Sequence, residues 1–366
     1  MKMPCSRCRE CQERGDRFCI YCGEYLTEKT AEVCTRCDEC RANGDSFCRY
    51  CGKRLVEDEN IFLKIGFVVG MVTAVILSIM LLFEYGVAIW GIPQVLPNLP
   101  DYGSTLILVV PVIVNVVSFD GVLSQIYYIL LFLAVTISIL IMFIKAYKPI
   151  LALENGDDKS VRETAFFEVP VLFAVLFFWE LVFVLILQGF GVELDTLPDM
   201  DTWKWMYELL EASVWEEVIT RILIIGLPMA LIALMMRHKG KDSWKYLFGG
   251  FGFSRTAMVL IVFSAVIFGA GHLNNWGWWK FFPTFAFGLI AGYLFCKYGV
   301  YATILLHFMT DYMTAESWVN GTDASVMTAL FILLTALACV PYTYIYIKKG
   351  VLALRDLFLD QSNGLR

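Results

Sequence analysis

Long apolar runs fill most of the chain after residue 60 and predict membrane-spanning helices. A helix needs about 20 mainly apolar residues to cross a bilayer, and shorter helices fit inside a bundle. The runs that meet this description lie at 65–83, 122–144, 165–187, 214–236, 257–272, 281–296, 300–318 and 325–347. The pattern predicts an all-α polytopic membrane helix bundle of about eight transmembrane helices.

The apolar segment 104–119 is a ninth candidate of a different kind. It is short, and it contains Pro111 and Asn115. A lipid-exposed span must satisfy every backbone hydrogen bond internally. We therefore expect a re-entrant or interfacial piece here rather than a full span.

The positions of Lys and Arg predict the orientation of the bundle, because these residues accumulate in short cytoplasmic loops. With the amino terminus inside, the inner loops between Lys145 and Lys349 hold nearly all of them, and the outer loops hold Lys204 and Lys280. The pattern predicts that both termini, including the tail 351–366, are cytoplasmic.

A cysteine-rich repeat precedes the apolar part of the chain. Ten of the 12 cysteines lie between Cys5 and Cys51, in two units that repeat with a period of 29 residues. Units this short bury too little surface to fold without metal or disulfides. Disulfides would require an oxidising compartment and a signal peptide, and residues 1–20 contain no apolar run. The spacing therefore favours zinc.

Each unit resembles a small zinc ribbon with Cys-x-x-Cys, ten residues, and Phe-Cys-x-x-Cys-Gly. The resemblance implies two structural zinc ions, held by Cys5, Cys8, Cys19, Cys22, Cys34, Cys37, Cys48 and Cys51. Cys8 with Cys11, and Cys37 with Cys40, offer an alternative first knuckle. The resulting organisation is a ribbon module at 1–58, with repeats 5–22 and 34–51, followed by a transmembrane domain at 61–350.

Composition narrows the functional classes. Hydrophobic residues make up 58% of the chain and charged residues 17%, which excludes a fully water-exposed protein. The chain has a net charge of -6 and therefore lacks the excess of Lys and Arg that is typical of nucleic-acid-binding proteins. Nucleic acid is not expected as its main partner. The expected partners are the lipid bilayer and an unknown cytoplasmic molecule that the ribbons recruit.

A few polar side chains interrupt the apolar spans and mark candidate chemistry, because charges inside a bilayer are costly. They are Glu216, Glu217, Arg221, His272, His307 and Asp311. A spacing of four places Glu217 with Arg221, and His307 with Asp311, on common helix faces. A carboxylate base with two imidazoles is suited to hydrolysis.

These residues resemble the motifs of the CAAX prenyl endopeptidase and bacteriocin-processing family of membrane proteases, also called CPBP or Abi. The motifs are Glu-Glu-x-x-x-Arg, Phe-x-x-x-His and His-x-x-x-Asn/Asp, and the resemblance covers roughly 165–345. It implies that Glu216 and His272 activate water, that Glu217 and Arg221 support the site, and that His307 with Asp311 stabilises an oxyanion. Asp311 departs from the Asn of the prenyl proteases. The implied substrate is a peptide or protein, with prenylated proteins included.

Two other functions fit the same residues. Glu216, His272 and His307 would be the ligands of a zinc metalloprotease, or the bundle would be a non-catalytic scaffold or immunity-type protein. A further acid, Glu180, lies in the middle of the third span. We expect Glu180 to pair with Arg221, or to share its polar cavity, because both lie at a similar depth.

Overall fold

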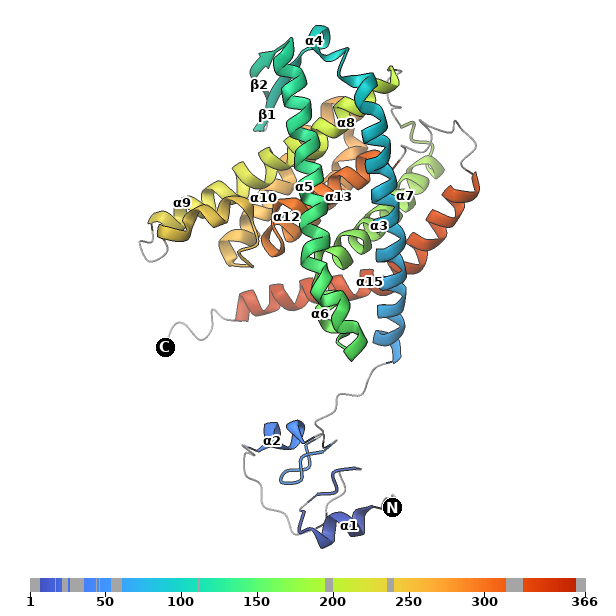
Figure 1. Ribbon diagram of the computed structural model, residues 1–366, viewed down its shortest axis with the longest axis vertical. Coiled ribbons are helices and arrows are strands. Elements are labelled where there is room, and N and C mark those ends of the chain that lie inside the picture. Colours follow the sequence, from blue (N-terminus) through green and yellow to red (C-terminus); the bar gives the residue numbers. More distant parts are fainter. Residues whose placement is uncertain are drawn as a thin grey trace. The chain divides into compact units, whose positions relative to one another are not determined.

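The structure is a computed structural model, which describes residues 7–16, 18–21, 26, 36–43, 45, 47–53, 61–110, 112–194, 200–235, 240–313 and 325–359. The chain divides into two compact units, Met1–Ile65 and Gly66–Arg366 (Figure 1). Three predicted zinc ligands, Cys5, Cys22 and Cys34, lie outside the described residues.

The first unit contains two short helices, α1 (Cys8–Glu13) and α2 (Cys37–Ala42), one in each repeat. The two repeats also pair with each other through their backbones. Phe18 N–H donates to the Arg49 carbonyl at 3.2 Å, and Phe47 N–H donates to the Ile20 carbonyl at 3.1 Å. The two repeats therefore form one structural unit rather than two independent modules.

Helices dominate the second unit. The longer helices are α3 (Ile61–Val95), α5 (Val122–Ala152), α7 (Ala165–Gly189), α8 (Thr202–Glu217), α10 (Arg255–Gly271), α12 (Phe281–Lys297), α13 (Val300–Tyr312) and α15 (Ser325–Leu359). Shorter helical pieces join them: α4 (Leu99–Tyr102), η1 (Leu153–Asn155), α6 (Asp158–Arg162), α9 (Leu227–Met235), η3 (Gly240–Phe248), α11 (Leu273–Trp276) and η4 (Trp278–Lys280). A π-helix, η2 (Val218–Gly226), continues α8 without a break.

Six helical stretches of the described chain are long and apolar enough to cross a membrane. They are Lys64–Val95, Val122–Ala152, Ala165–Gly189, Thr202–Met235, Trp278–Lys297 and Phe331–Leu352. The protein is thus a multi-pass membrane protein. The predicted spans 257–272 and 300–318 correspond to α10, with 17 residues, and α13, with 13, so a count of eight full spans is not confirmed.

The segment 104–119 is not helical. It forms an antiparallel hairpin of β1 (Ser104–Val110) and β2 (Val112–Phe119), with a register shift between Leu106 and Ile107. The strands are rich in Val and Ile, whose branched side chains favour extended backbone. The apolar run therefore forms a hairpin and not a spanning helix, as expected, and its strand structure was not predicted.

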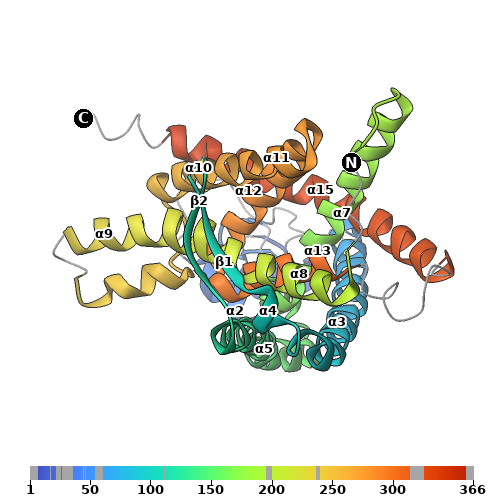
Figure 2. The same ribbon diagram turned by 90° about the horizontal axis from the view of Figure 1, so that it is seen from above.

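Helix α13 lies in the middle of the bundle, where it contacts α5, α7, α8 and α12 (Figure 2). Its side chains from Tyr301 to Met309 are all buried. Gly299 makes the turn into α13, with a φ of 109°, and a Cβ atom at this position would lie 2.7 Å from the Phe248 carbonyl oxygen. A glycine is therefore needed to bring α13 against its neighbours.

Candidate active site

Glu217 and Arg221 form a fully buried ion pair where α8 passes into the π-helix. Both side chains have no exposed surface, and Arg221 Nε donates to Glu217 Oε2 at 3.0 Å. Arg221 Nη1 also donates to Ser264 Oγ of α10 at 2.9 Å, and Ser264 donates to the Thr220 carbonyl at 2.6 Å. The pair thus ties the α8 end to α10.

Glu217 also holds His307 of α13. Its Oε1 lies 3.0 Å from His307 Nδ1, and because a carboxylate accepts, the imidazole donates. This contact fixes the ring so that Nε2 faces two other carboxylates. Those are Glu216 Oε2 at 3.8 Å and Asp311 Oδ2 at 3.5 Å.

His272 approaches Glu216 from the end of α10. Its Nδ1 lies 2.8 Å from the Phe268 carbonyl, which can only accept, so Nδ1 carries the proton. The opposite nitrogen, Nε2, lies 3.9 Å from Glu216 Oε2. The Phe268 ring lies against both imidazoles, at 4.7 Å from His272 and 5.8 Å from His307. Glu216 Oε2 is itself buried and makes no hydrogen bond.

Asp311 completes the cluster on the side of α8. Ser213 Oγ donates to Asp311 Oδ2 at 2.8 Å, and this serine has no exposed surface. The structure therefore brings all six predicted residues of the membrane domain into one cluster, from α8, η2, α10 and α13.

Sequence reasoning missed Ser213 and Ser264, although helical spacing contains a signal for both. Ser213 precedes Glu216 by three positions, and Ser264 lies four before Phe268 and eight before His272. Both spacings place the serines on the helix faces that present the site. A single serine in an apolar helix is common, however, so its presence alone does not indicate a functional role.

The expected pairing of Glu180 with Arg221 is wrong. Lys280 Nζ donates to Glu180 Oε1 at 2.7 Å, and the Lys280 ammonium also lies over the rings of Trp276 and Trp279. Glu180 is 30% exposed, whereas Arg221 has no exposed surface and binds Glu217 and Ser264. Similar depth along two helices does not place two side chains on facing surfaces.

A cavity of about 430 Å³ leads to the cluster. It lies between α8 on one side and α4 with β1 on the other, and Glu216 is among the residues that line it. The hairpin that contributes β1 lies beside α8 in the view from above (Figure 2). Glu216 is thus the member of the cluster that an entering molecule would meet.

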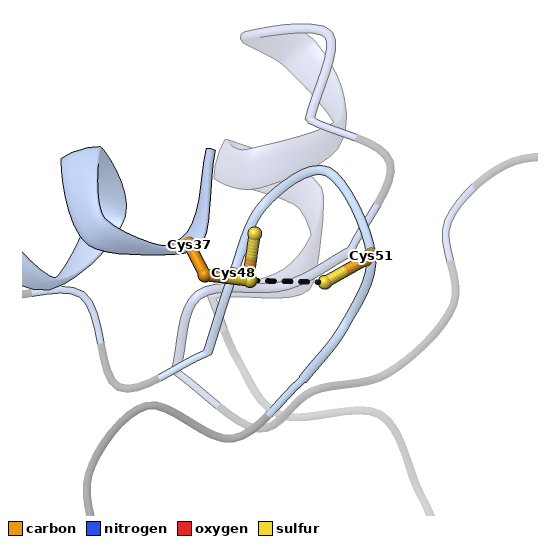
Figure 3. Close-up of side chains that lie close together, drawn as sticks. All are labelled: Cys37, Cys48 and Cys51. Atoms are coloured by element: carbon orange, nitrogen blue, oxygen red, sulfur yellow. Dashed lines mark hydrogen bonds between the residues drawn. The ribbon is translucent and has the colours of Figure 1, made fainter. Parts of the chain in front are cut away.

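A second cluster of reactive side chains lies in the first unit, where Cys37, Cys48 and Cys51 converge (Figure 3). Their sulfur atoms lie within 4.8 Å of one another, the only such group of three or more candidate metal ligands among the described residues. Cys37 and Cys51 are 3.6 Å apart, and Cys48 is 3.7 Å from Cys40. A tetrahedral ion with metal–sulfur bonds of about 2.3 Å separates its sulfurs by roughly 3.8 Å. The three sulfurs could therefore hold a metal ion.

The first repeat shows the same arrangement as far as it is described. Cys11 and Cys19 have no exposed surface, and their sulfurs lie 3.7 Å apart. Burial raises the pKa of the Cys11 and Cys40 thiols. A bound cation would offset that cost by stabilising the thiolates.

A comparison with protein-family models finds a match for residues 198–313. The matched model is described as type II CAAX prenyl endopeptidase Rce1-like. The chain carries a CAAX protease-family domain. This domain runs from just before α8 to the end of α13 and contains every member of the Glu216 cluster. No match is found among curated proteins or among solved structures.

Proposed function

We propose that the protein is an intramembrane endopeptidase in which Glu216 and His272 activate a water molecule. The observation that carries this proposal is the position of Glu216 Oε2, at 3.9 Å from His272 Nε2 and 3.8 Å from His307 Nε2. These gaps are too long for direct hydrogen bonds and suit groups that act on a common molecule between them. The match to the CAAX protease family supports the same reaction class.

The hydrogen bonds of the site assign a role to each nitrogen. Because His272 Nδ1 donates to a carbonyl, its Nε2 accepts, so a water can donate one proton to His272 and the other to Glu216. Glu216 takes a proton as the water oxygen attacks the peptide carbonyl carbon. As the C–N bond breaks, Glu216 returns that proton to the leaving nitrogen.

His307 would stabilise the negative charge that develops on the carbonyl oxygen. Its Nδ1 is occupied by Glu217, so when the ring is doubly protonated the Nε2–H faces the space beside Glu216. Asp311, held by Ser213, accepts hydrogen bonds and keeps the positive ring in place. In this proposal Glu217 and Arg221 support the site without touching the substrate.

Replacement of Glu216 tests the mechanism. Glu216→Gln keeps the shape and removes the proton acceptor, so we expect peptide cleavage to fall by at least about 10²–10⁴-fold while the bundle stays folded. The matched control is Glu193→Gln, an exposed acid outside the site. Cleavage by Glu216→Gln at the parent rate would disprove the mechanism. Prenylated and unprenylated CAAX peptides should be compared as substrates.

Two other functions remain testable beside this one. In a metalloprotease, Glu216, His272 and His307 would share a zinc ion, yet their donor atoms do not form a close group of three in the described structure. A chain shortened to begin near Asn60 lacks the cysteine repeats, so loss of its activity with a chelator would support that mechanism. If the parent protein cleaves no peptide and Glu216→Ala retains the cellular function, the protein is a scaffold.

We also propose that each cysteine repeat binds one zinc ion. In the second repeat, Cys37, Cys48 and Cys51 would supply three ligands, and Cys40, whose sulfur lies 3.7 Å from that of Cys48, would supply the fourth. The repeat then implies Cys8, Cys11, Cys19 and Cys22 in the first. This set uses the alternative knuckle in place of Cys5 and Cys34. The charge pattern supports both termini in the cytoplasm, where the ribbons would recruit their partner.

A further inference from the structure

Helix α3 carries a buried acid, Glu84, within the membrane span Lys64–Val95 and outside the matched family domain. Leu77, Leu81, Glu84 and Ala88 follow one another at spacings of four, three and four, and each is at most 2% exposed. Such spacing places side chains on one face of a helix. Glu84 therefore faces the interior of the bundle and not the lipid.

The face of α3 that carries Glu84 packs on the helices of the active site. Seven positions after Glu84, Gly91 lies so close to α8 that a Cβ atom there would be 2.5 Å from the sulfur of Met206. The Met206 carbonyl accepts a hydrogen bond from Tyr312 Oη of α13 at 2.5 Å. Tyr312 directly follows Asp311. This face of α3 thus looks onto the junction of α8 and α13, where Asp311 lies.

No described group compensates a charge on Glu84. Both of its carboxyl oxygens are buried, and neither has a hydrogen-bond partner among the described residues. The charged side chain that acts on Glu84 is Asp311, which is a second acid. An unpaired charge at this depth of a membrane is costly, so such an acid keeps its proton. Glu84 is therefore expected to be neutral.

Asp311 is the acid of the two that has partners for a negative charge. Ser213 Oγ donates to Asp311 Oδ2 at 2.8 Å, and His307 Nε2 lies 3.5 Å from the same oxygen. A hydrogen-bond donor and a cation both favour the ionised form of a carboxyl group. A protonated carboxyl group can also donate one hydrogen bond, and a carboxylate accepts it. Glu84 and Asp311 are thus suited to be an acid and a carboxylate side by side.

We propose that Glu84 is a positioning residue of the peptidase reaction, which as a neutral acid donates through a water molecule to Asp311 and keeps Asp311 ionised beside His307. This inference rests on the proposed peptidase function and adds a residue to it. Glu84 retains its proton throughout, so no bond forms or breaks at this residue. The ionised Asp311 in turn holds the positive His307 ring where an oxyanion would form.

The pH profile of kcat/KM tests the proposal, measured on the full chain in zwitterionic nanodiscs with a CAAX peptide that the parent cleaves. Glu84→Leu removes the donor, so Asp311 should hold its proton to a higher pH. The acidic limb of the profile should then move up by about one pH unit, with a rate about tenfold lower on that limb. At higher pH the rate should return to that of the parent, which a packing defect would not allow. Glu84→Met replaces Glu84→Leu if that variant unfolds.

Two matched substitutions show whether the donor is responsible. Glu84→Gln keeps a neutral group that can donate, so it should retain the pH profile of the parent. Ser78→Ala changes another buried polar residue of α3 and should also leave the profile unchanged. A shift of the acidic limb in Glu84→Gln as large as in Glu84→Leu, or an equal shift in Ser78→Ala, would overturn the inference.

A double variant separates Asp311 from the other charged groups around it. These are His307 on its own helix, Glu216 of α8 and Lys280 of η4, and α5 contributes Tyr128, which acts on Tyr312. Asp311→Asn has no acid at this position. Glu84→Leu added to Asp311→Asn should therefore cause no further shift of the acidic limb. The same shift with and without Asp311 would show that Glu84 does not act through it.

Infrared difference spectra measure the two acids without a substrate. The spectrum of the parent minus that of Glu84→Gln should contain the carbonyl band of a protonated carboxylic acid at neutral pH, and absence of this band would overturn the inference. Comparison with Asp311→Asn identifies the bands of Asp311. Its carboxylate band should form at a higher pH in Glu84→Leu than in the parent.

The infrared result also separates this inference from the peptidase proposal. If Glu84→Leu raises the pH at which Asp311 ionises but the parent protein cleaves no peptide, the action of Glu84 on Asp311 stands and the peptidase proposal fails. If the parent cleaves the peptide and the titration of Asp311 is the same in Glu84→Leu, the peptidase proposal stands and Glu84 is not a positioning residue.

Discussion

Glu217 is the residue on which most contacts of the site converge. Its two carboxylate oxygens are assigned to different partners, one to Arg221 and one to His307, and none of its surface is exposed. A buried charge that loses its partner is strongly destabilising, whereas an apolar replacement of the whole pair is often tolerated. The contribution of Glu217 to stability should therefore be distinguishable from the contribution of Glu216 to chemistry.

Glu217→Gln should destabilise the membrane unit by about 3–5 kcal/mol, because it leaves Arg221 buried without its counter-charge. The double variant Glu217→Gln with Arg221→Met should recover part of this loss. Thermal unfolding in detergent, followed by tryptophan fluorescence, measures both. Stability equal to that of Glu216→Gln would show that the ion pair is not structural.

Single substitutions can also determine which cysteines bind the zinc ions. If Cys40 is the fourth ligand of the second repeat, Cys40→Ser should lower the zinc content of the full chain from two ions to one, because the Cys40 sulfur lies 3.7 Å from that of Cys48. Cys34→Ser is the matched control and should retain both ions. Elemental analysis of the purified protein gives the ratio. One ion in Cys34→Ser and two in Cys40→Ser would support the ribbon spacing instead.

At the scale of elements, the site depends on the junction of α8 with the π-helix and the hairpin. A π-helical turn is rare and often marks functional positions, and here η2 begins immediately after Glu217. Trp215, on the preceding turn, donates to the Ile107 carbonyl of β1 and so holds the hairpin beside the cavity that leads to Glu216. Both features position the entrance to Glu216.

Trp215→Phe should loosen the hairpin without unfolding the bundle. The substitution keeps an aromatic ring and removes the N–H that donates to Ile107, a hydrogen bond of about 1 kcal/mol. Amide hydrogen exchange of peptides from 104–119 should accelerate by roughly fivefold. Trp179→Phe, which removes a similar bond from Trp179 to Thr343 in α15, is the control and should leave the hairpin unchanged.

The elements show where sequence reasoning succeeds and where it fails. Helix spacing placed Glu217 with Arg221 and His307 with Asp311, because contacts within one helix follow from its period. The partner of Glu180 was missed, because contacts between helices depend on rotation about each axis. The strands of the hairpin were missed because a short apolar run rich in Val and Ile does not distinguish a strand from another re-entrant or interfacial piece. The repeat alone also leaves open which cysteines bind zinc, because Cys5 or Cys11, and Cys34 or Cys40, could complete each set of four.

At the scale of the whole molecule, two units with different sources of stability share one chain. Among the described residues the first has few buried side chains, most of them cysteines, whereas the second has an extensive apolar core. In the second unit Glu168, with 1% exposure, joins α7 to α12 through Lys297 at 2.9 Å and to α15 through Lys349 at 3.7 Å. Metal should therefore matter to the first unit alone.

Removal of zinc should unfold the first unit and leave the second unchanged. Structural zinc provides about 10–16 kcal/mol to such modules. All 10 tryptophans follow residue 65, so the tryptophan-detected melting temperature of the full chain should be the same with and without chelator. Limited proteolysis between residues 1 and 58 should accelerate with chelator. A chelator-dependent melting temperature would show that the units are coupled.

The shortness of α10 has a consequence for the surrounding lipid. Its 17 residues extend for about 26 Å, less than the roughly 30 Å of a typical hydrocarbon core. Val259, Val262 and Val266 are exposed along it and would face acyl chains where α10 lies in the bilayer. A bilayer adapts to a short apolar surface by thinning. His272 ends this helix, so we expect thinning to bring the headgroup layer towards the Glu216 cluster and membrane thickness to affect the hydration of that cluster.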